Sequence, residues 1–268
     1  MGDASGVEVV AMTRTIGAEL RGARLGPGRD ESSLEALHGA LRDHHVVIVR
    51  DQDLEPGDLI AIGATFGELQ PSASARAVDG YPAVARLATH AGPAPDTFHF
   101  DDSCAAAPPA VAMTAIQSAP PIGGDALYAD LQAAYDSLSE PVRALVDGLR
   151  VVNESGALAA TPRTAEHPLV RVHPDTGRRS LCFDNWFSTR IVGVTPRESD
   201  ALLDLLRGHV ASAAHTCRIR WMPRTFAIWD NRCTSHFSVH DFDDERVVLR
   251  TTVAGEVPVA PTSSGPGG

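Results

Sequence analysis

The 268-residue sequence predicts one mainly β domain of the α+β class, built as an antiparallel barrel or sandwich with flanking helices. The candidate strands are short and numerous, and the amphipathic helices cluster early in the chain or stand between the strands. A hydrophobic content of 43% is enough for a sizeable core, and one large β-rich domain is common at this length. We expect a single domain over residues 1–256 and, because it is rich in Pro, Ser and Gly, a disordered tail over residues 257–268.

The candidate strands are short runs rich in Val, Ile, Thr and aromatic residues, which have high strand propensity. In chain order they are residues 7–12, 45–50, 84–87, 110–117, 126–128, 169–172, 181–183, 219–222, 225–229 and 247–253. Residues 17–25 are predicted to be irregular or an edge. Many short strands of this kind are typical of antiparallel barrels and sandwiches.

The candidate helices place apolar residues at helical spacing among polar ones. In chain order they are residues 32–43, 55–66, 131–138, 141–149 and 196–210. Ser33 can cap the first helix, and Pro56 stands near the start of the second, where proline is tolerated. The last helix is the clearest, because its leucines repeat among charged residues.

The remaining segments are predicted to be connections. Small and polar residues mark loops at residues 67–79 and 90–96 and a tight turn at residues 120–125. The polar stretch at residues 153–167 has no period and is predicted to be a mobile segment. No apolar run is long enough to span a bilayer, and we expect no secretory signal, because the N-terminus lacks a basic segment followed by an apolar one.

The composition excludes several classes of function. A formal net charge of −11 argues against binding to the phosphate backbone of nucleic acid. All 23 basic residues are arginines, which excludes lysine Schiff bases, P-loop lysines and Ser-Lys dyads. The G-x-S-x-G and G-x-G-x-x-G fingerprints do not occur. Four widely spread cysteines without a C-x-x-C pair predict a reduced, cytoplasmic protein.

The first candidate site is the His-x-Asp pattern of His99 and Asp101. On an extended strand these two side chains point to one face, whereas Phe98 and Phe100 point to the other. An imidazole and a carboxylate side by side, with one more histidine, make the 2-His-1-carboxylate triad of non-haem Fe(II) oxygenases. A second match, at His173, contains a proline and continues as Pro-Asp-Thr-Gly, which predicts a surface turn.

Two C-terminal histidines compete for the remaining ligand position. His236 follows the strand that ends at Trp229 and is expected to lie in a loop. His240 comes four residues later, so the pair could hold zinc on a helix, but the glutamate of an H-E-x-x-H motif is absent.

Two arginines near the C-terminus form the last candidate pattern. If residues 246–252 are a strand, Arg246, Val248 and Arg250 share one face. Two arginines on an inward face without an acid between them are costly unless they meet anions. The alternative is an exposed strand edge, where the arginines are solvated.

Taken in chain order, these patterns resemble the taurine/2,4-D (TauD/TfdA) family of Fe(II)- and 2-oxoglutarate-dependent dioxygenases. The resemblance extends from about residue 15 to about residue 258. The matching segments are residues 45–52, Phe66-Gly-Glu-Leu69, the His99/Asp101 pair, Gly123-Gly-Asp125, residues 185–192, Trp229-Asp-Asn-Arg232, His236, and Arg246 with Arg250. The resemblance implies a double-stranded β-helix, which is a jelly-roll or cupin-like barrel, with helices on one side and the site in the barrel mouth.

The resemblance also implies roles for these residues. His99, Asp101 and His236 look like the iron ligands, and the family register favours His236 over His240. Arg246 is similar to the arginine that pairs with the distal carboxylate of 2-oxoglutarate, a bidentate contact that suits guanidinium.

The substrate side is implied in the same way. Arg250 looks like the arginine that meets the substrate's own anionic group, and Gln70 and Phe187 are expected to border the substrate. The alternative for Arg250 is a structural pair with an acid such as Asp102 or Asp184.

Several positions depart from the family pattern. Ala126 stands where a threonine usually helps to hold 2-oxoglutarate, so binding of this cosubstrate is expected to be weaker unless Tyr128 or Ser188 compensates. Gln70 replaces a histidine that touches sulfonate in taurine enzymes, and Phe98 replaces a tryptophan. Taurine specificity is therefore not implied.

The function implied is oxidation, such as hydroxylation, of a small anionic organic substrate by O2, with Fe(II) as cofactor and 2-oxoglutarate converted to succinate and CO2. A cupin-like metal-binding protein without oxygenase activity is the alternative, and Ala126 is the feature in its favour. A zinc hydrolase lacks an evident general base, and halogenation is disfavoured because Asp101 fills the position that a halide needs. The expected partners are the substrate and O2, without nucleic acid or membrane, in a monomer or a homo-oligomer such as a dimer or tetramer.

Overall fold

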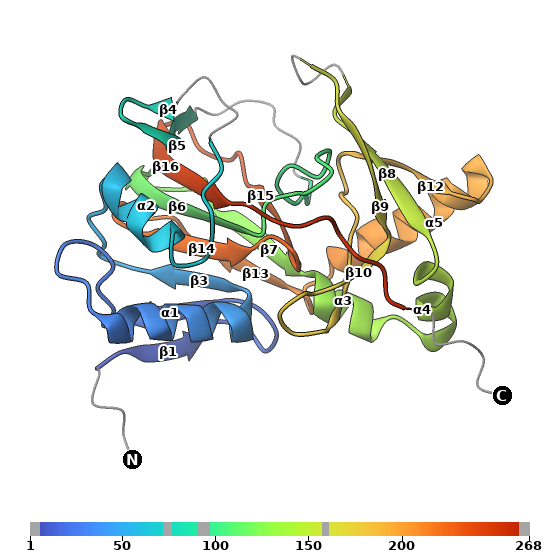
Figure 1. The fold of residues 1–268 in the computed structure, drawn as a ribbon, viewed down its shortest axis with the longest axis horizontal. Helices are drawn as coiled ribbons and strands as arrows, with labels where there is room; N and C mark the ends of the chain where they lie inside the picture. The colour runs from blue at the N-terminus through green and yellow to red at the C-terminus, as the bar shows by residue number, and fades with distance from the viewer. Residues whose placement is uncertain (1–5, 72–76, 90–96, 157–160, 263–268) are drawn as a thin grey trace.

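The computed structural model describes residues 6–71, 77–89, 97–156 and 161–262. Antiparallel strands form two facing sheets with helices on the outside, and a smaller β-and-helix lobe extends from one end (Figure 1). This arrangement is the jelly-roll, or double-stranded β-helix, that the sequence predicts.

The larger sheet contains eight described strands in the order β1-β2-β3-β14-β6-β16-β5-β4. Its strands are β1 (Glu8–Ala11), β2 (Ala18–Arg21), β3 (Val46–Val49), β4 (Ala77–Val78), β5 (Tyr81–Thr89), β6 (Val111–Ser118), β14 (Phe226–Asp230) and β16 (Arg246–Val253). Neighbouring strands are antiparallel except for β2 and β3. Because β6 and β14 are central and apolar on both faces, they are buried along nearly their whole length.

The smaller sheet faces the larger one and has the order β13-β7-β15. Its strands are β13 (Thr216–Ile219), β7 (Ala126–Asp130) and β15 (Thr234–Ser238). Buried residues of both sheets, such as Ile116 and Trp229 from one and Tyr128 and Ile219 from the other, form one apolar cluster. This cluster closes the inside of the barrel and leaves room for a cavity at one end.

Helices α1 (Glu31–His44) and α2 (Pro56–Gly63) cover the outer face of the larger sheet (Figure 1). Leu37 and Leu59 of these helices belong to one core with Val49 and Met113 of the sheet. Ser33 does not cap α1 as predicted. The cap is Asp30, whose Oδ1 accepts the Ser33 N–H at 2.8 Å.

The lobe is formed by the chain between β7 and β13. It contains α3 (Leu131–Ser137), α4 (Glu140–Val146), β8 (Arg150–Glu154), β9 (Thr164–Pro168), β10 (Val170–Val172), β11 (Arg179–Leu181), β12 (Ser188–Val192) and α5 (Pro196–Val210). The strands form a three-stranded sheet, β12-β8-β9, and the hairpin β10-β11. A second core, which includes Val151, Leu181 and Leu203, holds these elements together.

Several local predictions are wrong. Residues 18–21 form β2, which lies inside the sheet and not at its edge. The ends of the polar stretch at residues 153–167 belong to the hairpin β8–β9, where Asn153 and His167 are buried and bonded to Ser188 Oγ and the Ser103 carbonyl. Residues 157–160 of this stretch lie outside the described part. A buried polar residue with a partner removes the hydrophobic alternation by which a strand is recognised.

Two other segments also differ from expectation. The segment after Trp229 forms a tight turn and then strand β15, so His236 lies in a sheet and not in a loop. The strand placed at residues 219–222 is β13, three residues earlier, and β12 was not predicted. In the loop predicted at residues 67–79, residues 77–78 form β4 and residues 72–76 lie outside the described part. The loop predicted at residues 90–96 also lies outside it.

The predicted tail is described as far as Thr262. The Val172 N–H donates to the Val259 carbonyl at 2.9 Å, so this part of the predicted tail is attached to the lobe. Residues 263–268 lie outside the described part. Among the described helices, none combines the length and the apolar character that crossing a membrane requires.

Candidate active site

Two segments from different halves of the chain bring three candidate metal ligands together. His99 and His236 form an isolated β-bridge, in which each N–H donates to the other's carbonyl at 2.9 and 2.7 Å. Asp101 lies at the start of the turn that follows. Ligand atoms of His99, Asp101 and His236 lie within 4.8 Å of one another, and His240 is not part of this cluster.

The segment around His99 alternates as predicted, although it is not a regular strand. Phe98 and Phe100 are buried on the face opposite the cluster. The Phe98 ring meets the Phe237 ring edge-on at 4.8 Å between centroids. The His99 Nδ1 lies 3.2 Å from the Thr97 carbonyl, a contact that orients the imidazole.

Asn231 fixes the position of Asp101. Its Oδ1 accepts the Asp101 N–H at 2.8 Å, and its Nδ2 donates to the carbonyls of Asp101 and Pro109 at 3.1 and 2.9 Å. Asn231 is buried, so these bonds are shielded from water. The sequence shows Asn231 only as part of a motif, and this supporting role was not predicted.

Asp184 supports the segment from the other side. Its Oδ2 accepts the Phe100 N–H at 3.3 Å, and its Oδ1 accepts the N–H groups of Trp186 and Phe187 at 2.7 and 2.9 Å. Burial raises the pKa of Asp184, and the nearby His99 opposes this effect. Trp186 in turn places its ring edge-on to His99, at 6.0 Å between centroids.

The charges of the cluster suit a divalent cation. Burial acts to raise the pKa of Asp101, but Arg250, His236 and His99 outweigh it and hold that pKa at about 2. Burial lowers the pKa of His236 to about 3 against the effect of Asp101. Both residues are therefore deprotonated at neutral pH, as metal ligands must be.

Two buried atoms of the cluster, Asp101 Oδ2 and His236 Nδ1, have no hydrogen-bond partner. A buried polar atom without a partner is costly, so the cluster has donor capacity that the described protein groups do not use. Two imidazoles and one carboxylate are the donor set of non-haem Fe(II) sites. The residues present therefore fit Fe(II).

A cavity of about 230 Å³, here called the inner cavity, lies between the two sheets beside His236. Its lining residues are Leu87, Thr89, Thr114, Ile116, Ala126, Tyr128, Trp221, Trp229, His236, Ser238, His240, Arg246, Val248 and Arg250. The three β16 residues share this face, as the strand period predicts, and Leu249 packs on the opposite, helix-covered face. The alternative of an exposed edge is wrong, because β16 lies between β6 and β5.

Arg246 is buried in the wall of the inner cavity. Its Nη1 donates to the Gly124 carbonyl at 2.9 Å and its Nη2 to Ser238 Oγ at 3.2 Å. The guanidinium also lies 5.5 Å from the centre of the Phe242 ring. Burial lowers the pKa of Arg246, but a guanidinium remains protonated in proteins.

Arg250 pairs with Asp101 through its Nη2 and lies over the Trp229 ring at 5.2 Å. The sequence left open a structural pair with Asp102 or Asp184, and the observed partner is neither of them. Asp102 instead pairs with Arg163 of the β8–β9 hairpin. Arg250 keeps 27% of its side-chain surface exposed, so its side chain is not fully enclosed by the protein.

A second cavity of about 260 Å³, here called the outer cavity, adjoins Asp101. It is lined by Gln70, Pro71, Ala83, Ala85, Leu87, Asp101, Asp102, Pro109, Arg250, Thr251 and Thr252. Leu87 and Arg250 line both cavities, so the two meet at these residues.

The remaining predicted residues are divided between the cavities and the lobe. Gln70 lines the outer cavity, whereas Phe187 lines neither cavity and stacks on Trp186 at 5.1 Å between centroids. Tyr128 lines the inner cavity and stacks on His236 at 5.4 Å. Ser188 lies away from it and donates to Asn153 Oδ1 at 2.6 Å, so it cannot compensate for Ala126.

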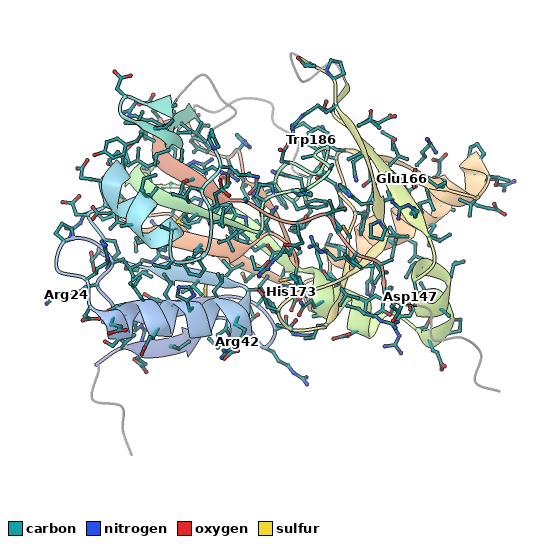
Figure 2. All side chains as sticks on the ribbon, in the orientation of Figure 1. Arg24, Arg42, Asp147, Glu166, His173 and Trp186 are labelled. Atoms are coloured by element: carbon teal, nitrogen blue, oxygen red, sulfur yellow. The ribbon has the colours of Figure 1, made fainter. Side chains whose placement is uncertain are left out.

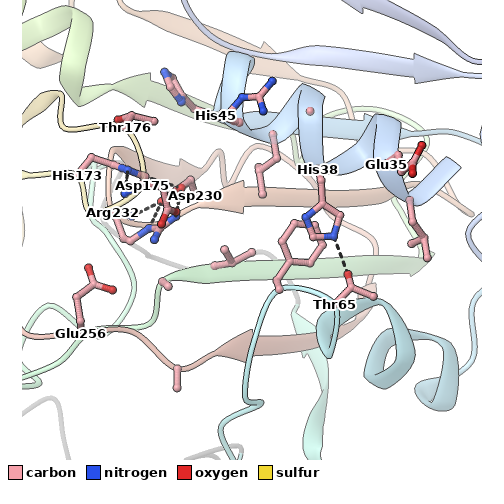
Figure 3. Close-up of a pocket in the computed structure, with 18 of the residues that line it drawn as sticks. Glu35, His38, His45, Thr65, His173, Asp175, Thr176, Asp230, Arg232 and Glu256 are labelled. Carbon is pink, nitrogen blue, oxygen red and sulfur yellow. Dashed lines mark hydrogen bonds and ion pairs between the residues drawn. The ribbon is translucent and has the colours of Figure 1, made fainter. Parts of the chain in front are cut away.

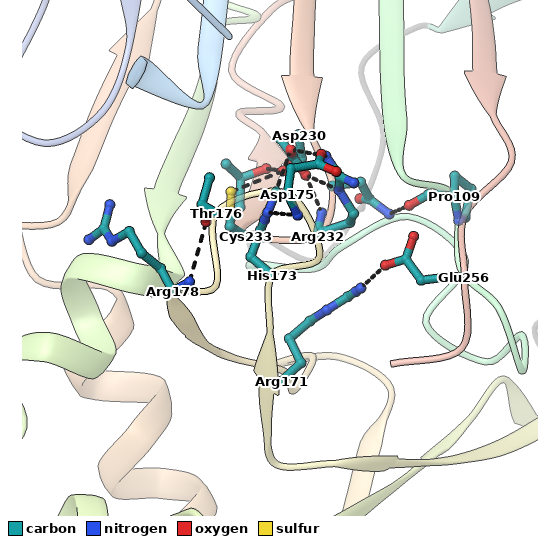
Figure 4. A network of polar contacts seen from close by, with 12 residues as sticks. Pro109, Arg171, His173, Asp175, Thr176, Arg178, Asp230, Arg232, Cys233 and Glu256 are labelled. Atoms are coloured by element: carbon teal, nitrogen blue, oxygen red, sulfur yellow. Dashed lines mark hydrogen bonds and ion pairs between the residues drawn. The ribbon is translucent and has the colours of Figure 1, made fainter. Parts of the chain in front are cut away.

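A second cluster, His173 with Asp230 and Cys233, also has the composition of a metal site. His173 lies in the predicted turn, but it is buried near the middle of the molecule and is not at the surface (Figure 2). Both Asp230 oxygens are engaged by Arg232, and Oδ2 also lies 3.0 Å from His173 Nε2 (Figure 4). The guanidinium already occupies the place of a cation, so this cluster is a structural network.

A further cavity is a groove of about 980 Å³ along α1. Its walls include His38, which lies 2.9 Å from Thr65 Oγ1, and the rim of the Asp230 network (Figure 3). None of the three candidate metal ligands lines it. The chemistry of the site therefore belongs to the two smaller cavities beside the cluster.

Comparison with known proteins agrees with this geometry. The family model described as "Taurine catabolism dioxygenase TauD, TfdA family" matches residues 8–252. An alpha-ketoglutarate-dependent sulfate ester dioxygenase of Pseudomonas putida is 34% identical, over 94% of this chain and 91% of its own length. An alkylsulfatase of Acinetobacter baylyi is 30% identical, over 92% of this chain and 84% of its own length.

The fold is shared with solved structures. That of a taurine dioxygenase from Burkholderia xenovorans is 39% identical and superposes with a TM-score of 0.87. The match covers 96% of this chain and 93% of the other. The similarity thus extends over both sheets, the lobe and the two cavities.

Proposed function

The chain belongs to the taurine catabolism dioxygenase TauD, TfdA family, and on that premise we propose that its substrate is a small organic sulfate ester or sulfonate. It is a 2-oxoglutarate-dependent non-haem iron dioxygenase that oxidises a small organic anion with O2 and forms succinate and CO2. The observation that most directly supports the substrate class is the position of the partly exposed Arg250 beside Asp101, where the two cavities meet.

His99, Asp101 and His236 hold the iron. Fe(II) and 2-oxoglutarate together supply the oxidising power once O2 binds. The chain supplies fixed ligands, because the His99–His236 bridge and the bonds from Asn231 set the backbone of all three residues. The donor set and the two unpaired atoms of the cluster support this assignment.

The inner cavity takes 2-oxoglutarate. Arg246 binds its distal carboxylate, and Ala126 borders that end without adding a polar contact. The inner cavity is lined by both Arg246 and the cluster residue His236. Its volume of about 230 Å³ suits a five-carbon dicarboxylate and leaves little space for bulk water.

The outer cavity takes the substrate. Arg250 binds the sulfate or sulfonate group with the N–H donors that Asp101 does not use, and Gln70 offers an amide on the opposite wall. A sulfate group held at Arg250 leaves the adjoining alkyl carbon near the metal ligands. The relatives named as a sulfate ester dioxygenase and an alkylsulfatase, at 34% and 30% identity, support this class over a carboxylate, because the relatives named for phenoxypropionate are only 26% and 28% identical.

A matched pair of substrates tests the assignment. Succinate formation is measured with an alkyl sulfate and with the alcohol of the same chain length, at equal Fe(II), 2-oxoglutarate and O2. We expect the sulfate to stimulate succinate formation at least tenfold over the alcohol, because a bond to a charged group contributes about 1.5–3 kcal/mol. Equal stimulation would contradict an anionic substrate.

Arg250 variants separate substrate binding from support of Asp101. Arg250→Ala should raise the KM for the alkyl sulfate at least tenfold, by the same bond of about 1.5–3 kcal/mol. Arg250→Lys should raise this KM less than Arg250→Ala does, since lysine keeps the charge but lacks the planar guanidinium. If the KM for the sulfate is unchanged while the affinity for Mn(II) falls, Arg250 serves only Asp101.

We also propose a reducing compartment, such as the cytoplasm. The four cysteines are free and buried, and no pair of them forms a disulfide. A melting temperature that is independent of added reductant supports this placement.

A further inference from the structure

We propose that Ser238 is a further ligand of the cosubstrate and that its hydroxyl donates a hydrogen bond to the distal carboxylate of 2-oxoglutarate beside Arg246. This role rests on the proposed use of the inner cavity for 2-oxoglutarate. It assigns a binding residue that was not predicted from the sequence, where Tyr128 and Ser188 were the candidates to compensate for Ala126.

The position of Ser238 follows from the pairing of two strands. Ser238 ends β15 and lies directly opposite Ala126, the first residue of β7, in an antiparallel register. Directly opposite residues point to the same face with Cβ atoms about 4.5–5.5 Å apart. Both residues line the inner cavity, so a hydroxyl missing at position 126 is present on the next strand.

The hydrogen-bond pattern leaves the Ser238 proton available. Its Oγ accepts from Arg246 Nη2 at 3.2 Å and has no other side-chain partner in the described part of the chain. A serine hydroxyl still has one proton to donate. The two other hydroxyls from Ser or Thr that line the cavity are committed, because Thr114 donates to the Leu249 carbonyl at 3.1 Å and Thr89 to the Arg246 carbonyl at 3.4 Å.

The pair formed by Arg246 and Ser238 is organised before a ligand arrives. Arg246 is held by the Gly124 carbonyl on one side and by the Phe242 ring, which restricts its guanidinium. Its remaining N–H donors and the Ser238 proton lie at the same end of the cavity. A carboxylate has two oxygens, so one can accept from Arg246 and the other from Ser238.

Binding of N-oxalylglycine, an unreactive analogue of 2-oxoglutarate, to the Mn(II)-loaded protein tests the role without turnover. The dissociation constant is measured by calorimetry for Ser238→Thr and Ser238→Val, which have nearly the same shape but differ in the hydroxyl. We expect the Thr variant to bind within about threefold of the natural protein and the Val variant to bind about ten- to a hundredfold more weakly. Equal binding by the two variants would overturn the assignment.

A second pair of variants tests the placement opposite Ala126. Ser238→Ala should weaken binding of N-oxalylglycine about tenfold or more, and adding Ala126→Ser should recover most of that loss. If the double variant does not recover binding, Ser238 does not act through the distal carboxylate, and the assignment is overturned. Ser118→Ala, which changes a half-buried serine of β6 outside the cavity, is the matched control and should not change binding.

The controls also separate this role from the proposed function. If the natural protein with Mn(II) does not bind N-oxalylglycine, the use of the inner cavity for 2-oxoglutarate is wrong. If it binds and the Val variant binds equally well, only the role of Ser238 is wrong. Oxamate, which can chelate the metal but lacks the distal carboxylate, should bind the Thr and Val variants equally.

Discussion

At the scale of single residues, backbone hydrogen bonds set the geometry of the candidate metal cluster. The two histidines are joined through their peptide groups, and Asp101 is held by its own N–H and carbonyl through Asn231. Substituting a ligand side chain therefore removes a donor atom without removing these bonds. The effect of each substitution on activity can be measured in a protein that still folds.

His99→Ala, Asp101→Ala and His236→Ala are each expected to abolish succinate formation, because the proposed assignment gives the iron three protein ligands and each substitution removes one of them. His240→Ala is the matched control: it borders the same cavity but lies outside the cluster, and it should retain most of the activity. Succinate is quantified in single-turnover and steady-state assays. Loss of activity in the His240 variant, with activity kept in the His236 variant, would reverse the ligand assignment.

The residues that carry chemistry were easier to predict than those that support them. His99 and Asp101 stand two apart, and Arg246 and Arg250 stand four apart, so strand period alone places each pair on one face. Asn231 acts through contacts with residues far away in the sequence, and no local pattern reveals such contacts. His173 shows the same limit, because its turn was predicted but its burial against Asp230 was not.

At the scale of elements, α5 depends on a narrow apolar face. Leu203 and Leu206 are buried in the core of the lobe, whereas Leu205, between them, is half exposed. The N-terminus is closed by Thr195 and Glu198 in a capping box. The repeating leucines are visible in the sequence and predicted this helix with its observed bounds, whereas the capping box was not part of the prediction.

Leu203→Ala should lower the free energy of unfolding by about 2–5 kcal/mol, because it opens a cavity in a packed core. Leu205→Ala, in the same helix, should change it by no more than about 1 kcal/mol, since half of that side chain is already in water. Urea denaturation followed by circular dichroism measures both. Equal losses would mean that α5 does not pack as described.

Whether a strand could be predicted depends on which kind of residue it buries. β3, β6 and β14 have apolar residues on both faces and were predicted close to their observed positions. β8, β12 and β15 were not predicted, because buried polar residues such as Asn153, Ser188 and Ser235 interrupt the apolar pattern. Such polar residues can be buried only because the folded chain provides hydrogen-bond partners for them.

At the scale of the whole molecule, the Asp230 network joins the barrel to the lobe. Asp230 ends β14 in the larger sheet, and its partner His173 belongs to the turn between β10 and β11 (Figure 4). Burial acts to raise the pKa of Asp230, but the bonds from His173 and Arg232 outweigh it and leave the pKa below its ordinary value. The network therefore links stability to pH.

Because the pKa of Asp230 is lower in the folded than in the unfolded chain, its stabilisation is complete above the unfolded value, near pH 4, and is lost as the pH falls through the folded value. We expect the free energy of unfolding to drop below about pH 4. Asp230→Asn should lower it by about 3–5 kcal/mol at neutral pH and flatten this acid dependence. Asp175→Asn, which removes an exposed partner of Arg232, should cost no more than about 1 kcal/mol and leave the acid dependence intact.

The jelly-roll architecture could be predicted from the sequence because the motif segments occur along the chain in the same order as in the family that it resembles. The arrangement of cavities did not follow from it. The inner and outer cavities meet at Leu87 and Arg250, which lie on neighbouring strands β5 and β16 but are far apart in the chain. Only tertiary packing brings such residues together.

The bridge between His99 and His236 has a consequence for how the protein folds. About half of the chain separates these two residues, and the lobe is formed by the sequence between them. An unfolded chain must close a very long loop before the site exists, and contacts of such range slow folding. The nascent chain therefore lacks the proposed iron site. The metal should bind only after the barrel has closed, stabilising the native state without guiding the chain towards it.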